Sequence, residues 1–189
     1  MGDISLELGG GPLAARHHEA ICRLYDTVFS AAPFAWSETE SRRHADMLTE
    51  MRGAPGFGVV LASGAALAGF AYGHTLPVDH RWWTGFEPPL PEEVTTEWEG
   101  RTFALVDLAV AEPHRGRGIG RGLIETLLSS RGESRAVLTV QPTAQRTQAI
   151  YRHLGWKRMG RKGPFDGALS RYWDLYAIDL APDGGDRRT

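Results

Sequence analysis

A glycine- and arginine-rich turn in the second half of the chain has the composition of an anion-binding site. It reads Arg115-Gly116-Arg117-Gly118-Ile119-Gly120-Arg121, after an apolar run and before an amphipathic one. Glycines allow consecutive backbone N–H groups to turn inward without clashes of Cβ atoms. The start of a helix adds unpaired N–H groups and the positive end of the helix dipole. The sequence therefore predicts a site for phosphate oxygens, with a plain glycine-rich turn as the alternative.

The spacing of the glycines excludes two common nucleotide-binding loops. A P-loop needs Gly-Lys followed by Ser or Thr, and the sequence contains no such triplet. A dinucleotide-binding turn needs Gly-x-Gly-x-x-Gly, but the sixth position from Gly116 is Arg121 and the sixth from Gly118 is Leu123. If the turn binds an anion, it therefore belongs to another class of anion site.

The pattern Arg-x-x-Gly-x-Gly, here Arg115, Gly118 and Gly120, resembles the pyrophosphate loop of the GCN5-related N-acetyltransferase (GNAT) family. Downstream, Tyr151 and the pair Gly155-Trp156 resemble the Tyr-x-x-x-Gly-aromatic segment of that family. The resemblance covers about residues 103–159. It implies an α/β (α+β) fold with a central, mixed, twisted sheet of about six to seven strands. About four helices would flank this sheet, and its parallel strands would splay apart at the cofactor site.

The resemblance also implies that acetyl-CoA is the co-substrate. The strand 102–110 would pair with the pantetheine arm where it diverges from the strand 136–140, and the glycine turn would hold the pyrophosphate. One departure is that Ala144 and Thr147 stand where many members of the family carry Asn and Ala. No spacing of His, Cys or acidic residues indicates a metal site. The implied cofactor-binding residues are Leu108, Ala109, Val110, Arg115, Gly116, Arg117, Gly118, Ile119, Gly120 and Arg121.

Direct acetyl transfer needs a neutral amine and benefits from a proton donor for the leaving thiolate. The resemblance assigns the donor role to Tyr151, because a phenol with a pKa near ~10 stays protonated at neutral pH. The alternative is an aromatic ring that fills the groove between helix and sheet. Asp107 is the candidate base, and its alternative role is to order a loop or pair with an arginine. His74 is a rival base, and a small fraction of neutral amine could suffice without any base.

The long connection 76–101 is the expected wall of the acceptor site, together with helices between residues 14 and 51. It contains five acids and no Lys or Arg between residues 87 and 99, which suits a cationic substrate; the alternative is a solvated face. Aromatic rings beside acids favour an amine with an apolar body. Alternatively, the rings attach a long loop to the core. The candidate substrate-binding residues are Trp82, Trp83, Phe86 and Trp98.

Charge is distributed unevenly along the chain. The formal net charge is −2, yet residues 114–162 contain eleven Lys or Arg and two acids, a formal charge of +9. Such a segment indicates an anionic ligand, either a nucleotide cofactor or nucleic acid, or else a solvated surface rich in arginine. Because no recognised nucleic-acid motif accompanies it, we expect no nucleic-acid partner.

The 189 residues suit one domain. We expect an acetyltransferase domain over 1–181, divided into a substrate-side half, 1–101, and a core that binds acetyl-CoA, 102–160. Residues 182–189 are predicted to be a disordered tail. The only cysteine is Cys22, and neither a signal peptide nor an apolar run long enough for a membrane helix is present, so we expect a cytoplasmic protein without a membrane partner.

Periodicity predicts the individual elements. Strands are expected at 4–8, 57–62, 67–74, 102–110, 136–140, 156–159 and 172–180, and helices at 14–31, 37–51, 119–131 and 143–154. Strict alternation in the strand 102–110 would place Asp107 on the same side as Phe103 and Leu105.

These observations predict an N-acetyltransferase. It would move the acetyl group of acetyl-CoA directly to a primary amine, on a small molecule or a peptide, in a ternary complex. The alternative is a non-catalytic acyl-CoA-binding sensor or subunit, which would carry the same glycine turn. A homodimer is a common arrangement in the family that the sequence resembles.

Overall fold

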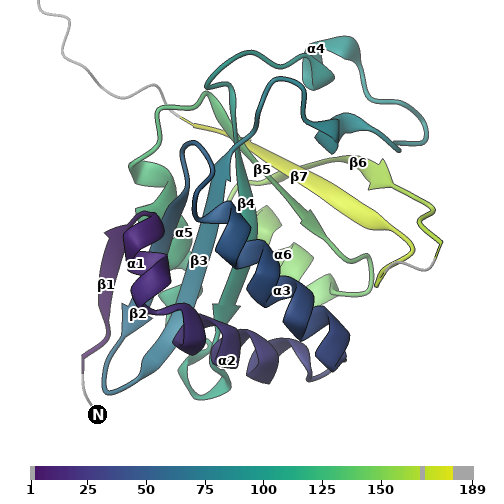
Figure 1. The fold of residues 1–189 in the computed structure, drawn as a ribbon. Coiled ribbons are helices and arrows are strands. Elements are labelled where there is room, and N and C mark those ends of the chain that lie inside the picture. Colours follow the sequence, from purple (N-terminus) through teal and green to yellow (C-terminus); the bar gives the residue numbers. More distant parts are fainter. Residues whose placement is uncertain (1–2, 167–168, 181–189) are drawn as a thin grey trace, which may run out of the picture.

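The computed structural model describes residues 3–166 and 169–180, and these form a seven-stranded mixed sheet in the order β1-β2-β3-β4-β5-β7-β6 (Figure 1). The predicted fold class is confirmed, whereas the predicted tail 182–189 lies outside the described residues. The strands are β1 Ser5–Gly9, β2 Gly58–Ser63, β3 Leu67–Thr75, β4 Thr102–Val110, β5 Arg135–Val140, β6 Lys157–Lys162 and β7 Trp173–Asp179.

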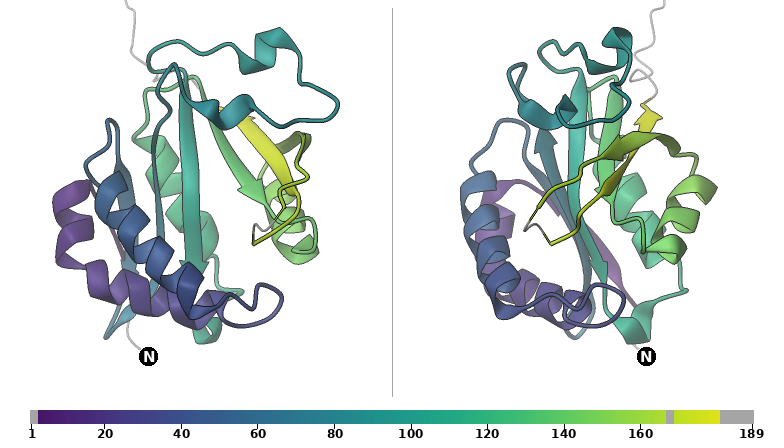
Figure 2. Two further views of the ribbon diagram at one scale, coloured as in Figure 1. Left: turned by 45° about the vertical axis from the view of Figure 1, so that its right-hand side comes forward. Right: turned by 90° about the vertical axis from the view of Figure 1, so that its right-hand side faces the viewer.

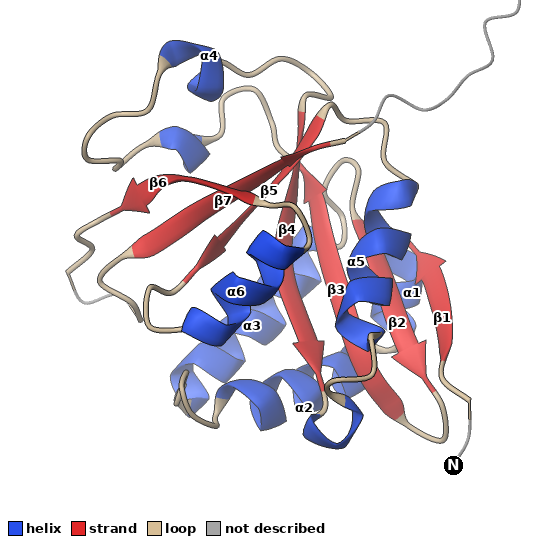
Figure 3. Cartoon of the chain, turned by 180° about the vertical axis from the view of Figure 1, so that it is seen from behind, coloured by secondary structure: helices blue, strands red, loops and turns tan. Residues whose placement is uncertain are grey.

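Helices cover both faces of the sheet. The helices α1, α2 and α3 lie on one face, and α5 and α6 lie on the other (Figures 2 and 3). The expected helix 14–31 is in fact two helices, because the backbone at His17 leaves the helical region with φ −107° and ψ 13°. The bounds are α1 Gly11–Arg16, α2 His18–Phe29, α3 Glu38–Met51, α4 Glu92–Thr95, α5 Ile119–Ser129 and α6 Gln145–His153.

The helix α3 begins at a capping box, whose sequence pattern is Ser37 followed three residues later by Glu40. The Glu40 side chain accepts a hydrogen bond from the Ser37 backbone N–H at 2.9 Å, and the Ser37 hydroxyl oxygen accepts one from the Thr39 N–H at 3.3 Å. Two otherwise unpaired backbone donors are thus satisfied. This fixes the start of the helix whose buried face packs against the sheet through His44 and Leu48.

The strands β4 and β5 run parallel but pair over only three residues each. Thr102, Phe103 and Ala104 face Arg135, Ala136 and Val137, and the pairing then stops. Beyond that point β5 continues beside β7 as far as the pair Val140–Asp174. From Leu105 to Val110, no strand in the described part of the chain pairs with β4 on this side (Figure 1). The predicted splay of the two parallel strands is therefore present.

A β-bulge at Val106 changes which side of the sheet the end of β4 faces. Tyr72 pairs with Asp107, but the next residue, Gly73, pairs with Leu105, so Val106 is an extra residue. The extra residue reverses the alternation after it. Asp107 therefore faces α2 and α3, and the prediction that it shares a side with Phe103 and Leu105 is wrong.

The connection between β3 and β4 passes across the strands on the far side of the splay, which are β5, β7 and β6 (Figure 2). It contains α4 and a short 3-10 turn, Arg81–Trp83, and it reaches the edge strand β6. There, Phe86 forms an isolated antiparallel bridge with Lys162, and the Gly163 N–H donates to the Gly85 carbonyl at 2.9 Å. The connection is thus packed onto the sheet. No helix in the described part of the chain is long and apolar enough to cross a membrane.

Candidate active site

Asp107 lies on β4 beside the splay, with its side chain only 12% exposed. Its Oδ2 accepts a short hydrogen bond from the Tyr72 hydroxyl on β3 and lies 3.9 Å from Nε2 of His44 on α3. The Tyr72 hydroxyl is the only hydrogen-bond donor to this carboxyl group among the described residues, and it does not contact Oδ1. Three elements therefore converge on one carboxyl group.

Burial tunes Asp107 toward proton exchange near neutral pH. Desolvation raises its pKa to about 6, although the hydrogen bond from Tyr72 acts in the opposite direction. A buried carboxylate is destabilised because few dipoles replace its lost water. At pH 7 the group is therefore mostly ionised and yet is a stronger base than an exposed carboxylate.

Tyr151 lies on α6, on the other side of the splay. Its ring is buried and meets the Trp156 ring edge-on, with the ring centroids 5.7 Å apart. The hydroxyl makes no hydrogen bond within the described residues, and burial, followed by the negative charge of Asp107, raises the pKa of Tyr151. The phenol therefore keeps its proton at neutral pH. The ring fills space beside the sheet, as the alternative interpretation expects, while its hydroxyl remains available.

The glycine turn has the backbone of an anion site. Gly116 and Gly118 have φ angles of +74° and +80°, which other residues adopt only with strain. Gly118 is the N-cap of α5, and the first turn of that helix contains no acidic residue and no side-chain cap. The N–H groups of Ile119, Gly120 and Arg121 therefore have no acceptor within the helix. These residues fit a pyrophosphate group.

Arg115 and Arg121 of the turn each have a defined contact in the structure. Arg121 forms an exposed ion pair with Glu125 at 2.6 Å, and the Nε of Arg115 donates to the Val110 carbonyl at 3.0 Å. Arg115 thus lies at the end of β4, where the strand has no neighbour on the splayed side. Both contacts use only the Nε–H, and each guanidinium group has four further N–H donors that could bind phosphate.

The backbone of β4 presents alternate residues to the splay. The Ala111 N–H donates to the Ala68 carbonyl on β3 at 2.8 Å, which fixes the direction of the groups before it. Because successive N–H groups along a strand point to opposite edges, those of Leu108 and Val110 point away from β3. Of the three residues that the sequence predicts for the pantetheine arm, these two face the opening, while the backbone groups of Ala109 face β3.

The aromatic residues of the connection serve mainly as anchors. Phe86 is buried, and Trp83 donates from Nε1 to Glu97 at 2.9 Å, while Glu97 forms a buried ion pair with Arg135 at 2.6 Å. Trp98 is 52% exposed and lies under the Arg101 guanidinium. These contacts match the alternative that the rings attach the connection to the core.

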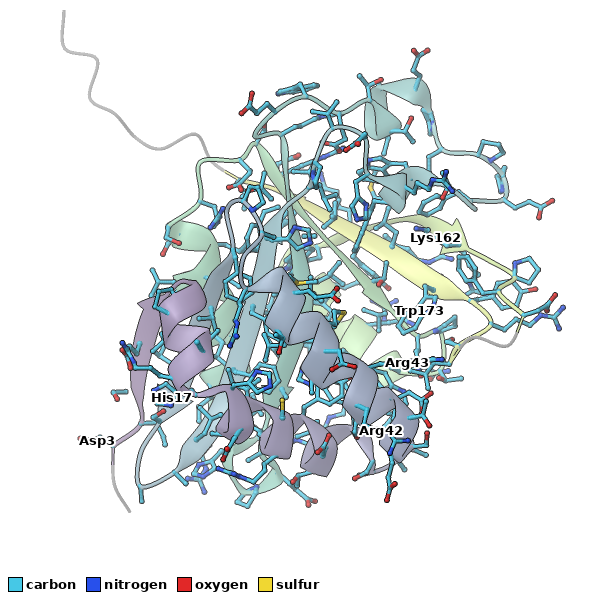
Figure 4. The ribbon with its side chains drawn as sticks, in the orientation of Figure 1. Asp3, His17, Arg42, Arg43, Lys162 and Trp173 are labelled. Atoms are coloured by element: carbon cyan, nitrogen blue, oxygen red, sulfur yellow. The ribbon has the colours of Figure 1, made fainter. Side chains whose placement is uncertain are left out.

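The connection is also tied to β6 through Trp82, whose carbonyl accepts a hydrogen bond from Nζ of Lys162 (Figure 4). An open depression of about 580 Å³ remains beside these anchors, and Trp83 and Phe86 contribute to its wall. A substrate role for the four rings stays a prediction.

Two further predictions concern bases and metals. His74 bonds through Nδ1 to the Thr75 carbonyl at 2.9 Å, and its ring faces His80, so the structure does not bring it into the cluster around Asp107. Within residues 3–166 and 169–180, no group of three or more His, Cys, Asp or Glu side chains is arranged to hold a metal ion.

Sequence reasoning missed Tyr72 and His44. Both belong to regular periodic elements, a strand and an amphipathic helix, where an aromatic residue or a lone histidine is usually part of the core. Tyr72 lies opposite Asp107 because of the register between β3 and β4, which the sequence alone does not determine. We find no signal in the sequence that would have selected His44.

Comparison with known proteins agrees with this geometry. Residues 19–156 match the family described as the acetyltransferase (GNAT) family. No curated protein matches the chain in sequence.

Several solved structures share the fold. They include an aminoglycoside 6'-acetyltransferase type Ii, which is 17% identical with a TM-score of 0.66 and is covered over 98% of its length by 94% of this chain. The ribosomal-protein-S18-alanine N-acetyltransferase from Escherichia coli is 15% identical with a TM-score of 0.63, covered over 100% of its length by 98% of this chain. The protein yncA from Salmonella typhimurium, solved with its cofactor acetyl-CoA, is 15% identical with a TM-score of 0.63. It is covered over 99% of its length by 96% of this chain. The splayed strands, the glycine turn and the family match together show that this chain belongs to the GNAT family of acetyltransferases.

Proposed function

We propose that the protein is an N-acetyltransferase that moves the acetyl group of acetyl-CoA directly to a primary amine in a ternary complex. The observation that carries this proposal is the placement of Asp107 and Tyr151 on opposite sides of the splay, close enough for the charge of Asp107 to act on the pKa of Tyr151. A base and an acid therefore flank one opening, and this arrangement would accelerate direct transfer.

The residues of the chain have separate roles in this proposal. Acetyl-CoA, when bound, supplies a thioester carbonyl as the electrophile. Asp107 binds the ammonium group of the acceptor and takes a proton at Oδ1, and its raised pKa increases its basicity. The Val110 N–H points into the opening and is available as a donor to a carbonyl oxygen. Tyr151 holds a proton at its hydroxyl for a leaving thiolate.

The acceptor in this proposal is a primary amine, either of a small molecule or of a peptide. Two of the three named structural neighbours are described as acting on an aminoglycoside and on an alanine of a ribosomal protein, so this fold serves both kinds of acceptor. In this chain the rings of Tyr25, Phe29, Phe34 and Trp36 form one contiguous cluster on the side that Asp107 faces. An apolar wall with one deep carboxylate favours an amine with an apolar body.

Replacing Tyr151 by Phe tests the chemical step. We expect kcat for thiol release with a panel of amines to fall at least about tenfold, because general acid catalysis typically contributes 10²–10⁴. The affinity for acetyl-CoA, measured by calorimetry, should stay within about twofold, since the ring is kept. Tyr172→Phe, which removes a hydroxyl elsewhere, is the control. Unchanged turnover in Tyr151→Phe would remove this residue from the mechanism.

Binding of acetyl-CoA is tested at the two ends of α5. Gly118→Glu puts a negative charge and a strained residue into the proposed pyrophosphate site, so calorimetry should detect no binding of acetyl-CoA. Gly132→Glu adds the same charge just beyond the other end of the helix, where a Cβ meets open space, and should bind normally. Tight binding by Gly118→Glu would contradict the site. Tight binding by the wild type without transfer to any amine would favour the non-catalytic alternative.

A further inference from the structure

A buried imidazole lies beside the proposed base. The side chain of His44 is 0% exposed, and its Nε2 lies 3.9 Å from Oδ2 of Asp107. Neither ring nitrogen of His44 has a hydrogen-bond partner within the described residues. A neutral imidazole carries a hydrogen on one of these nitrogens, and an unpaired buried N–H costs free energy.

The surroundings hold the imidazole ring in one orientation. The Tyr25 ring of α2 stacks on it with the centroids 3.5 Å apart and the planes at 10°, and Phe70 and Tyr72 of β3 lie at 6.5 and 6.1 Å. A phenylalanine could make the same stacking contact without burying an unpaired N–H. The polar ring therefore has a cost that packing alone does not explain.

We propose that His44 is a positioning residue for Asp107, whose Nε2–H becomes a second hydrogen-bond donor to Oδ2 beside the Tyr72 hydroxyl when the acceptor amine binds. The inference rests on the proposed function, in which Asp107 takes the proton of the amine. With Oδ2 held by two donors, Oδ1 is directed into the opening. A gap of 3.9 Å is longer than a hydrogen bond, and contacts of this kind often shorten only in the complex with substrate.

His44 is uncharged at neutral pH, so it can donate a hydrogen bond to Asp107 without adding a positive charge beside it. Burial, with a smaller effect from His18, lowers the pKa of His44 to about 4. The imidazole is therefore neutral at the pH at which Asp107 is ionised. The titratable groups that face the pair are Tyr25 and His18 from α2, Tyr72 from β3 and, across the splay, Tyr151 from α6.

Three variants separate the donor from the ring. His44→Phe keeps the stacking and removes both nitrogens. In His44→Gln the amide nitrogen of the new side chain reaches the place of Nε2. In His44→Asn it reaches the place of Nδ1. His17→Gln, at the junction of α1 and α2, is the control for replacement of a histidine outside the cluster (Figure 4).

The main measurement is the titration of the Asp107 carboxyl carbon by NMR, with an acceptor amine from the panel present. Loss of a donor to the ionised carboxylate should raise the midpoint by about 0.5–1 pH unit in the Phe and Asn variants. The Gln variant and the His17→Gln control should match the wild type. Nitrogen NMR of the wild type should show the hydrogen on Nε2. In steady-state assays the Phe and Asn variants should lose about tenfold in kcat, with KM for acetyl-CoA within twofold.

Two outcomes would overturn the proposal. One is that the Asp107 carboxyl titrates with the same midpoint pH in His44→Phe and His44→Gln, which would mean that His44 only fills space. The other is a hydrogen on Nδ1 instead of Nε2. Neither measurement depends on turnover, so a wild type that transfers no acetyl group would count against the proposed function alone. If His44→Phe fails to fold, the Asp107 midpoints of His44→Gln and His44→Asn still test the proposal, because only the Gln variant keeps a donor at the place of Nε2.

Discussion

The Asp107 carboxyl group is buried, and its burial has a thermodynamic cost. Its pKa of about 6 in the folded protein lies above the ordinary value of 3.8. Between these two values the folded state binds more protons than the unfolded state, so stability falls as the pH rises through this range. Above pH 6 the full cost is present.

The Asp107→Asn variant should therefore be more stable than the wild type at pH 7.5, by about 3 kcal/mol. The amide keeps an oxygen for the Tyr72 hydroxyl and carries no charge. Toward pH 4, where the native carboxyl is protonated, the gain should disappear. Urea unfolding at the two pH values measures this, and Asp46→Asn, on an exposed part of α3, is the control. Equal stability of Asp107→Asn and wild type at pH 7.5 would contradict the raised pKa.

At the scale of the element, the bulge in β4 depends on a glycine in the neighbouring strand. A Cβ at Gly73 would lie 2.0 Å from the Ala104 carbonyl oxygen and 2.8 Å from Cζ of Phe103. The backbone oxygen cannot rotate away as a side chain could. The close approach of β3 and β4 beside the bulge is thus possible only without a side chain at this position.

Gly73→Ala should lower the free energy of unfolding by about 2–3 kcal/mol, as overpacking of a well-packed site does. Chemical denaturation measures the loss. Gly132→Ala, where a Cβ meets nothing within 4 Å, should change stability little. A Gly73→Ala variant as stable as the wild type would show that the strands can separate here at little cost.

Local patterns in the sequence predicted the parts of the site that local physics determines. The glycine turn, the capping box at Ser37 and the start of β4 each depend on neighbours along the chain, and the structure contains all three. The side that Asp107 faces depends on Gly73 in another strand, and the contact with His44 depends on how α3 packs. Such non-local contacts leave no periodic signal, so alternation along β4 gave the wrong side.

At the scale of the whole molecule, the connection between β3 and β4 braces the end of the sheet where β4 and β5 are still paired. The Arg135 guanidinium, on β5, donates to Oγ1 of Thr102 on β4 at 2.8 Å and to Glu97 of the connection at 2.6 Å. Both charged side chains are largely buried. One ion pair therefore joins the connection to both strands where the splay begins.

Glu97→Ala should destabilise the protein by about 3 kcal/mol, because it leaves the Arg135 charge buried without its partner. Adding Arg135→Met should recover part of the loss, since no buried charge then remains. Glu99→Ala, at an exposed position of the same connection, should have little effect. Thermal unfolding of the four proteins gives the comparison, and full stability of Glu97→Ala would contradict the bracing role.

The extra residue at position 106 also bears on how this chain should be aligned with others. Removing one codon there would restore strict alternation and turn the carboxylate from the side of α2 and α3 into the apolar layer beneath α5. Two chains can thus share every strand and helix and still carry the equivalent acidic residue in neighbouring columns of a sequence alignment, because only one of them has the extra residue. A search for the equivalent carboxylate in distant sequences should therefore follow the pairing with β3 rather than the residue count from the glycine turn.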